Sequence, residues 1–453
     1  MTFLRTLFWF AVAAVLMFVA VWLAERPGAV TVQWRGWRLD TSVGVLLAGL
    51  LIAILLAVAL WLLYRWIVGA PGALLEGWGD SRRRRGYRAL TQGLAAVAAG
   101  DAVEAQKNAR KAEQLLSEPS LTLLLSAQAA QLNGDREGAK RTFNAMLDDE
   151  HMAFLGLRGL IAQSLNDGNQ AQALDYAERA FRLRPQTPWV VHSLFDMQAQ
   201  IGRWREAQET LETGLRTRVV TADKGRVLKA LLLVERSRQL ERDGKDGEAL
   251  GLARKAFGLA PERIAVANRL AELQIKAGQG ARAMKTLERA WALAPHPDLA
   301  QLYLKGSGES DALKRVGLVR RLVEHKIDDV ESHVAIAQAA LDAGLWGEAR
   351  HHLELAGGEH PTARICRMMA DVEERSGGDS RKVHEWLARA ADAPADRAWR
   401  CTACGAHHET WRPVCESCGA FGTLHWRAPG TYGHILPPEV RPKPALPATD
   451  TKV

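Results

Sequence analysis

The sequence predicts an all-α protein, in which two transmembrane helices are followed by a solenoid of helical repeats that a small metal-bound β ribbon caps. Three observations support this fold class: two long apolar runs near the N-terminus, a 34-residue spacing of glycines through the middle, and two CxxC pairs before the C-terminal tail. With 453 residues and 48% hydrophobic content, the chain can bury a sizeable core, which excludes a disordered protein.

The two apolar runs, Leu7 to Ala24 and Val43 to Tyr64, contain no charged residue. As helices, both are long enough to cross a hydrocarbon core of about 30 Å. A cleaved signal peptide is the alternative for the first run, but no convincing small-residue cleavage site follows it. Residues 1–68 are therefore predicted to form a two-helix transmembrane anchor.

The linker between the two runs reads "VTVQWRGWRLD" and alternates apolar and polar residues on both sides of Gly36. A small hairpin and an irregular connector both fit this pattern. Positive charge predicts the orientation, because cytoplasmic flanks of membrane helices are enriched in Lys and Arg. If both runs span, seven arginines flank one side and three the other, which places the long C-terminal part in the cytoplasm. The three are Arg26, Arg35 and Arg38, and the seven are Arg5, Arg65, Arg82, Arg83, Arg84, Arg85 and Arg88.

Residues 69–88 form a basic neck that contains the run "SRRRRGYR". The formal charge of +8 and the pI near 9.3 come largely from this cluster beside the membrane. Such a cluster attracts anionic headgroups, so membrane lipids are the expected partner. Nucleic acid is not expected, because no basic residues alternate with stacking aromatics on a strand pattern.

Residues 89–396 have helical periodicity and an internal repeat. Glycines recur every 34 residues at 100, 134, 168 and 202, again at 244 and 278, and again at 344 and 378. The glycine permits a turn between antiparallel helices, and alanines five and twelve residues later let helices approach closely. Two irregularities interrupt the register: eight extra residues around "TRVVTADK", and a turn expected near residue 311 that has lost its alanine.

This pattern resembles the tetratricopeptide repeat, a helix-turn-helix unit whose stacked copies form a superhelix with a concave binding groove. Three other features of this region could suggest a site. The stretch "GQGARA" from Gly278 to Ala283 follows a helix and not a strand, which argues against a dinucleotide site. His351, His352 and His360 are interpreted as solvated residues at a helix end, and Cys366 as a small packing residue.

Residues 397–427 contain Cys401, Cys404, Cys415 and Cys418, and a glycine follows each CxxC pair. Two such knuckles can close a tetrahedron of thiolates around a metal, and four cysteines leave no open position, so the metal is predicted to be structural. Zinc is the first choice, and a single iron suits the same ligands. A disulfide fits poorly with a reducing compartment. One of His407, His408 and His425 replacing a cysteine ligand is a further alternative.

Four aromatic residues surround the knuckles: Trp399, Trp411, Phe421 and Trp426. We expect some to pack within the ribbon and others to dock it onto the last repeats, because the linker that precedes it is very short. Residues 428–453 are rich in proline and are predicted to be a disordered tail.

The order of parts resembles the HemY family, whose members are inner-membrane proteins of proteobacteria associated with protoheme synthesis. The two runs, the linker "VTVQWRGWRLDTSVGVLL", the arginine-rich neck and the early repeats carry this resemblance. The ending "WRCTACGAHHETWRPVCESCGAFGTL" is similar to the rubredoxin-like C-terminus of the LapB family, membrane-anchored adaptors of lipopolysaccharide assembly. LapB proteins usually have one span, so the N-terminus departs from that family.

These resemblances imply a non-catalytic scaffold at the bacterial inner membrane, with two spans and the repeats in the cytoplasm. HemY implies tetrapyrrole-synthesis enzymes as partners and heme biosynthesis as the process. LapB implies the alternative: an adaptor that regulates envelope synthesis by delivering a client enzyme to a membrane protease. A third hypothesis, an enzyme or electron carrier that uses the cysteine site, requires redox-active iron.

Overall fold

The computed structural model describes residues 17–18, 22, 29–34, 37–116 and 118–428. The first apolar run lies mostly outside these residues, and so does the proline-rich tail from residue 429 onward. The chain divides into two compact units, Met1–Asn133 and Gly134–Val453, which are described in turn. Both are dominated by helices, which confirms the predicted all-α class.

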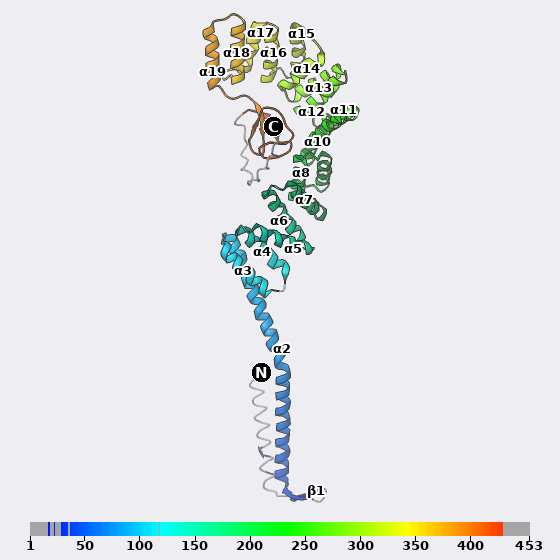
Figure 1. Cartoon of the computed structure of the whole chain (residues 1–453), viewed down its shortest axis with the longest axis vertical. Coiled ribbons are helices and arrows are strands. Elements are labelled where there is room, and N and C mark those ends of the chain that lie inside the picture. Colours follow the sequence, from blue (N-terminus) through cyan, green and yellow to red (C-terminus); the bar gives the residue numbers. More distant parts are fainter. Residues whose placement is uncertain (1–16, 19–21, 23–28, 35–36, 117, 429–453) are drawn as a thin grey trace, which may run out of the picture. The chain divides into compact units, whose positions relative to one another are not determined.

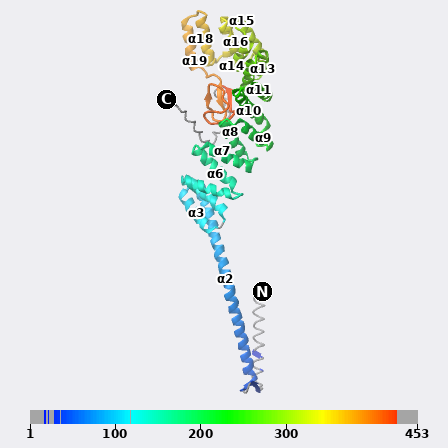
Figure 2. The same cartoon turned by 45° about the vertical axis from the view of Figure 1, so that its right-hand side comes forward.

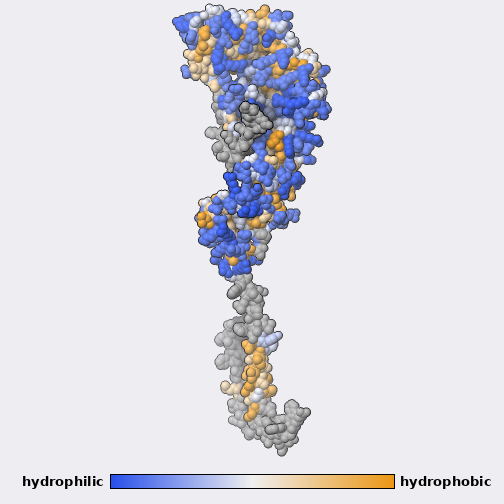
Figure 3. Space-filling view, in the orientation of Figure 1, coloured by the Kyte–Doolittle hydropathy of each residue, from blue (hydrophilic) through white to orange (hydrophobic). Residues whose placement is uncertain are grey.

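The N-terminal unit begins with a hairpin of two antiparallel strands, β1 (Ala29–Trp34) and β2 (Trp37–Ser42). The hairpin interpretation of the linker is thereby confirmed. One helix of 57 residues, α2 (Val43–Ala99), follows it. Its segment Ala48–Arg65 has a mean hydropathy of 2.2 and no buried residue, and it is the one candidate span within the described part of the chain. Figure 3 shows this segment as a continuous hydrophobic surface.

The end of α2 packs against α3 (Ala102–Leu115) and α4 (Pro119–Leu132) as the first repeat. Its core contains small and branched residues such as Ala105 and Leu125. The neck belongs to the same helix, and it is joined to the repeat by a hydrogen bond of 2.8 Å from the Tyr87 hydroxyl to the Glu118 carboxylate. The apolar segment, the basic neck and the first repeat therefore share one continuous helix.

The second unit is a series of antiparallel helix pairs followed by a small sheet (Figure 1). The helices are α5 (Arg136–Ala145), η1 (Met146–Asp148), α6 (Ala153–Asn166), α7 (Gln170–Leu183), α8 (Pro188–Gln200), α9 (Trp204–Arg216), α10 (Ala222–Arg242), α11 (Asp246–Leu259), α12 (Ile264–Lys276), α13 (Gly280–Leu293), α14 (Pro297–Ser307), α15 (Ala312–Val323), η2 (Glu324–Lys326), α16 (Val330–Asp342), α17 (Trp346–Gly357), α18 (Ala363–Arg375) and α19 (Ser380–Asp392).

The periodic glycines and alanines do what the sequence predicts. Gly168, for example, has a φ of 73°, a left-handed conformation that ends α6 and turns the chain into α7. Each alanine five residues after a periodic glycine is buried, and an adjacent helix approaches it closely. These alanines are Ala105, Ala139, Ala173, Ala207, Ala249, Ala283 and Ala349.

The irregular repeats depart from the register in definable ways. The eight extra residues lengthen α10 to 21 residues, whereas most neighbouring helices have 13 or 14. The turn expected near residue 311 lies at Gly308, with a φ of 68°. The last turn uses Gly377 in the left-handed conformation and not Gly378, so the glycine spacing was one residue off at this point.

The sheet is the predicted ribbon. It consists of β3 (Ala398–Cys401), β4 (His407–His408) and β5 (Leu424–Arg427), arranged as an antiparallel sheet with β3 in the centre. Its cluster of buried residues is small: Trp399, Cys401, Cys415 and Leu424.

Repeat packing predicts a sharp difference between two alanines of α13. Ala283 is buried and its Cβ lies near Gly306, whereas Ala281 is exposed. Ala283→Leu should lower the free energy of unfolding by about 1–3 kcal/mol, because the extra atoms have no space. The matched control Ala281→Leu should change it by less than about 0.5 kcal/mol. Urea unfolding followed by circular dichroism measures both, and equal effects would contradict the close packing of this position.

Candidate metal centre

Each CxxC pair folds as a tight knuckle closed by the glycine that follows it. The N–H of Gly405 donates to the carbonyl of Cys401 at 2.9 Å, and the N–H of Gly419 donates to the carbonyl of Cys415 at 2.8 Å. Both glycines have φ above 70°, which a residue with a Cβ adopts only with strain. The glycines are therefore required by the backbone that presents the thiols.

The four sulfur atoms converge to a distance that fits a metal. All Sγ atoms lie within 4.8 Å of one another. The pairs Cys401–Cys418 and Cys404–Cys415 are each 3.7 Å apart. A tetrahedral ion with metal–sulfur bonds of about 2.3 Å places its sulfur ligands about 3.8 Å apart. The four residues thus fit a structural zinc, and the same geometry suits a single iron.

The surroundings of the sulfurs favour the thiolate form at one position. Burial raises the pKa of Cys401, but hydrogen bonds from the Thr423 hydroxyl and from the N–H groups of Cys404 and Ala403 outweigh it and lower that pKa to about 7. The Thr423 oxygen is 3.1 Å from Cys401 Sγ. Burial raises the pKa of Cys415 and of Cys418. A bound cation would stabilise the thiolate form of these two residues and so offset the effect of burial on their pKa.

The histidines of the ribbon lie beside the cluster and not in it. Among the described residues, the group that can hold a metal consists of the four cysteines. His408 Nε2 is 3.4 Å from Cys415 Sγ, which is hydrogen-bonding distance. His425 contacts Arg263, and burial together with Arg263 and Arg427 lowers its pKa to about 4. His407 is exposed at the edge strand.

The ribbon packs against the middle of the solenoid, beside α8 and α10 (Figures 1 and 2). Phe421 is the anchor: its ring centroid lies 5.6 Å from that of Phe195 and 5.9 Å from that of Trp204. Phe421 also belongs to the solenoid core cluster, with 4% of its surface exposed. The prediction that the aromatics dock the ribbon onto the last repeats is wrong, because the complementary apolar surface is built by α8, α9 and α10.

Polar contacts fix the same docked position. Arg263 precedes α12, and its guanidinium donates to the carbonyls of Leu424 at 3.2 Å and Gly422 at 3.4 Å. The amide of Gln200, at the end of α8, donates to the carbonyl of Gly419 at 3.0 Å. A Cβ on Gly419 would lie 2.5 Å from the Gln200 amide nitrogen, so glycine also permits this approach.

A third contact joins the ribbon to the start of α14. The His296 ring lies 4.5 Å from Trp426 and 5.2 Å from Trp399, measured between centroids. His296 Nδ1 accepts the N–H of Asp298, and burial lowers the His296 pKa to about 3, so the ring is neutral. His296, Arg263 and Gln200 could not be picked out from the sequence, because no motif separates these positions from other repeat residues.

Of the other patterns in the repeats, Gly278 and Cys366 behave as interpreted, whereas His351 and His352 lie in the middle of α17 and not at a helix end. Gly278 is a turn glycine between α12 and α13, and Cys366 is fully buried. His352 is only half-buried, but it is not simply solvated, because its Nδ1 lies 3.0 Å from His333 Nδ1. Burial lowers the pKa of both rings, so they are paired as neutral groups.

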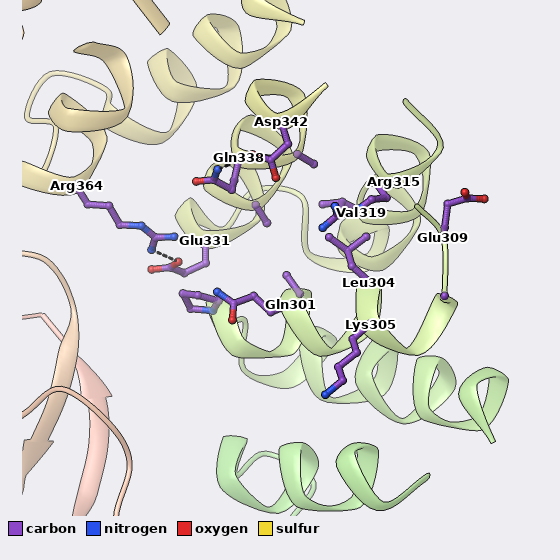
Figure 4. Close-up of a pocket in the computed structure, with 15 residues that line it drawn as sticks. Gln301, Leu304, Lys305, Glu309, Arg315, Val319, Glu331, Gln338, Asp342 and Arg364 are labelled. Atoms are coloured by element: carbon purple, nitrogen blue, oxygen red, sulfur yellow. Dashed lines mark hydrogen bonds and ion pairs between the residues drawn. The ribbon is translucent and has the colours of Figure 1, made fainter. Parts of the chain in front are cut away.

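A cavity of about 610 Å³ opens on α14, α15 and α16 next to the ribbon (Figure 4). Its rim holds the ion pair of Arg364 and Glu331, whose atoms are 2.9 Å apart. Lys305 and Arg315 also line it, and neither forms an ion pair within the described residues. The cavity therefore carries two cations that a ligand can approach.

Two parts of the chain match models of known protein families. Residues 28–134 match the family model described as HemY protein N-terminus. The N-terminal part of the chain is HemY-like. Residues 242–305 match a tetratricopeptide repeat model, so the predicted repeat class is confirmed as well.

Two relatives align with very different shares of this chain. Protein HemY of Escherichia coli K12 is 32% identical over 140 residues, which are 30% of this chain and 35% of that protein. The similarity thus spans about a third of HemY. The probable magnetosome protein Mms48 of Magnetospirillum gryphiswaldense is 26% identical over 452 residues, 93% of each chain.

Among solved structures, the Naa15/Naa10 complex bound to HypK-THB has a TM-score of 0.41 and 13% identity, covering 70% of this chain and 54% of that one. The TPR2AB domain of yeast Sti1 in complex with pHSP90 has a TM-score of 0.26 and 14% identity, covering 70% and 99%.

The cysteine geometry predicts how two cysteine variants differ. Cys404→Ser should abolish stoichiometric zinc binding, because a hydroxyl is a poor replacement for a thiolate ligand. The solenoid should keep its helical signal, since Phe421 is the one ribbon residue among the buried residues of its two core clusters. The control Cys366→Ser changes a buried cysteine of α18 and should retain the metal. Elemental analysis and circular dichroism of the purified full chain measure both quantities. Full zinc occupancy in the Cys404→Ser variant would show that Cys404 is not a ligand.

Proposed function

We propose that the chain is a non-catalytic, membrane-anchored scaffold that binds other proteins through the groove of its repeats. The observation that carries this proposal is the continuity of α2, which joins an exposed apolar segment to a repeat solenoid. The tetratricopeptide repeat supplies surface and no reactive group, and the four-cysteine cluster has no free ligand position for catalysis.

The cavity on α14 to α16 is the proposed partner site. Glu331 is paired with Arg364, and Glu309 lies 3.9 Å from Lys314, so these acidic groups are partly neutralised. Asp342 also lines the cavity and accepts a hydrogen bond from the Gln338 amide at 3.2 Å. Lys305 and Arg315 remain as cations, and the amide of Gln301 can bind a peptide backbone. A segment with carboxylate groups complements this lining.

The N-terminal resemblance and the distribution of arginines support a membrane arrangement for the scaffold. We place residues 1–68 in the bacterial inner membrane as two spans, with the neck (69–88), the solenoid (89–396), the ribbon (397–427) and the tail (428–453) on the cytoplasmic side. Arg82, Arg84 and Arg85 are exposed on α2, which supports contact of the neck with anionic headgroups.

The process that the scaffold serves is proposed from similarity. The HemY-like N-terminus supports heme biosynthesis, with tetrapyrrole-synthesis enzymes as partners. The metal ribbon supports the second candidate, a LapB-like adaptor between an envelope enzyme and a membrane protease. A relative aligned over 93% of both chains is named as a magnetosome protein, so the name of a relative does not decide among processes.

Crosslinking in membranes followed by purification tests the scaffold and its groove. The intact chain should recover tetrapyrrole-synthesis enzymes, and Lys305→Glu with Arg315→Glu should lower their yield by reversing the charge of the cavity. The control carries Lys285→Glu and Lys382→Glu, two exposed lysines on α13 and α19, and should recover as much as wild type. Recovery of a membrane protease with an envelope enzyme would favour the LapB-like adaptor, and unchanged yield in the cavity variant would exclude this cavity as the site.

Sidedness is tested separately by proteolysis. Trypsin should leave the solenoid intact in spheroplasts and degrade it in inverted membrane vesicles, because the proposed orientation exposes the repeats to the cytoplasm. Immunoblotting with an antibody against the ribbon detects the difference, and a periplasmic protein serves as the opposite control. Degradation in spheroplasts would reverse the assigned orientation.

A further inference from the structure

We propose that the metal ribbon is a removable occupant of the solenoid: it covers a protein-binding surface on α8, α10 and the starts of α12 and α14, and loss of the metal uncovers it. The partner is a protein segment that presents an aromatic side chain followed by free backbone carbonyls, as residues 421–424 do in the covered state. This inference rests on the proposed scaffold function and concerns a second surface, which adjoins the cavity of Figure 4 at the start of α14.

The covered surface already has the features of a peptide site. Phe421 fills an apolar recess formed with Phe195 and Trp204, and a cavity of about 360 Å³ remains beside it. The recess is lined by side chains of the solenoid and by four ribbon residues. An aromatic side chain in a desolvated pocket is the usual anchor of a protein interface.

Arg263 is the polar half of the surface. Its guanidinium is partly buried, and burial lowers its pKa. Within the described part of the chain, each of the guanidinium's hydrogen bonds goes to the ribbon. The neighbouring carboxylate of Glu262 is paired with Arg226 at 3.1 Å. When the ribbon leaves, Arg263 therefore presents unused donors to any segment that offers carbonyl or carboxylate oxygens.

The docked state also contains groups that docking leaves unpaired. Among the described residues, His296 Nε2 and Trp426 Nε1 are buried without a hydrogen-bond partner, and they lie on opposite sides of the contact. Arg400 Nε, in the central strand of the ribbon, is also unpaired. Water would satisfy these groups in an open state, so their burial offsets part of the gain from packing.

The metal determines whether the ribbon stays docked, because the loop that contacts the solenoid, residues 419–422, follows the second CxxC knuckle. Gly419, Phe421 and Gly422 directly follow Cys418, and their backbone position depends on the thiolates that hold both knuckles together. The ribbon has too few buried residues to keep that loop without the metal. The short linker is fixed to α18 through the N–H of Ala363 and the carbonyl of Pro394, so a released ribbon stays tethered.

Footprinting with hydroxyl radicals on the detergent-solubilised full chain measures the opening. With zinc bound, Phe195 should be oxidised slowly, and chelation with EDTA should raise its rate about tenfold, because the ring gains access to solvent. Zinc readdition should restore protection. Trp291 of α13 is fully buried, and its indole N–H donates to Ser332 of α16, so it should stay protected throughout and reports that the solenoid remains folded.

A labelled peptide tests what the uncovered surface binds. The probe has the sequence of residues 418–427 with serine in place of Cys418, and its control has alanine in place of Phe421. The probe should bind the chelated chain about tenfold more tightly than the zinc-loaded chain, and the control peptide should not show this gain. Equal binding to both states, or equal binding of both peptides, would overturn the proposal.

Phe421→Ala in the full chain should open the contact without changing a cysteine ligand. This variant therefore tests the proposal even if chelation also loosens the solenoid. This variant should retain zinc, expose Phe195 and bind the probe. The control Leu387→Ala removes an exposed apolar side chain of α19 and should behave as wild type. Protection of Phe195 in Phe421→Ala would contradict the removable occupant. If Phe195 stays protected in Phe421→Ala but crosslinking still recovers partners, the scaffold proposal holds and the removable ribbon is excluded. If the surface opens but crosslinking recovers no partner, the scaffold proposal is excluded, and the metal-dependent opening still holds.

Discussion

The convergence of four sulfur atoms is the constraint on which the C-terminal part of the structure depends. The ribbon buries few side chains, and two of the four in its core cluster are cysteines, so a metal–thiolate centre has to replace the hydrophobic core that the segment lacks. The loop after Cys418 inherits its position from that centre. Because Phe421 and Gly422 lie in this loop, and Leu424 begins the strand that follows it, the contact with the solenoid is a consequence of the metal site.

The solenoid supplies the other half of the contact by spreading it over several repeats. Gln200, Arg263 and His296 belong to three different repeats, yet all contact residues between 419 and 426. A repeat protein is held together by neighbouring units, and such contacts between distant segments are uncommon in it. The hydrogen bond from Gln200 to Gly419, 219 residues apart in sequence, therefore restrains repeats that otherwise only touch their neighbours.

The parts that could be predicted from the sequence are those with local causes. A left-handed turn needs glycine and a close helix approach needs alanine, so the 34-residue pattern located most turns, and paired CxxC motifs located the sulfur cluster. The register failed at Gly378, where the neighbouring Gly377 takes the turn. Docking could not be predicted, because the recess for Phe421 combines Phe195 from α8 and Trp204 from α9, and neither residue is unusual in its own repeat. The short linker pointed to the last repeats, but proximity in sequence does not create a complementary surface.

The cavity on α14 to α16 and the surface on α8 and α10 differ in polarity, which explains why the ribbon covers the second and leaves the first open. The cavity on α14 to α16 is lined by ion pairs, amides and the cations Lys305 and Arg315, and such a surface is stable in water. The surface on α8 and α10 is apolar around Phe195, and an exposed apolar surface invites non-specific association. The proposed membrane anchor increases that risk, because it concentrates neighbouring copies in a thin layer. A tethered ribbon at high effective concentration protects the apolar surface and still yields to a specific partner once the metal is lost.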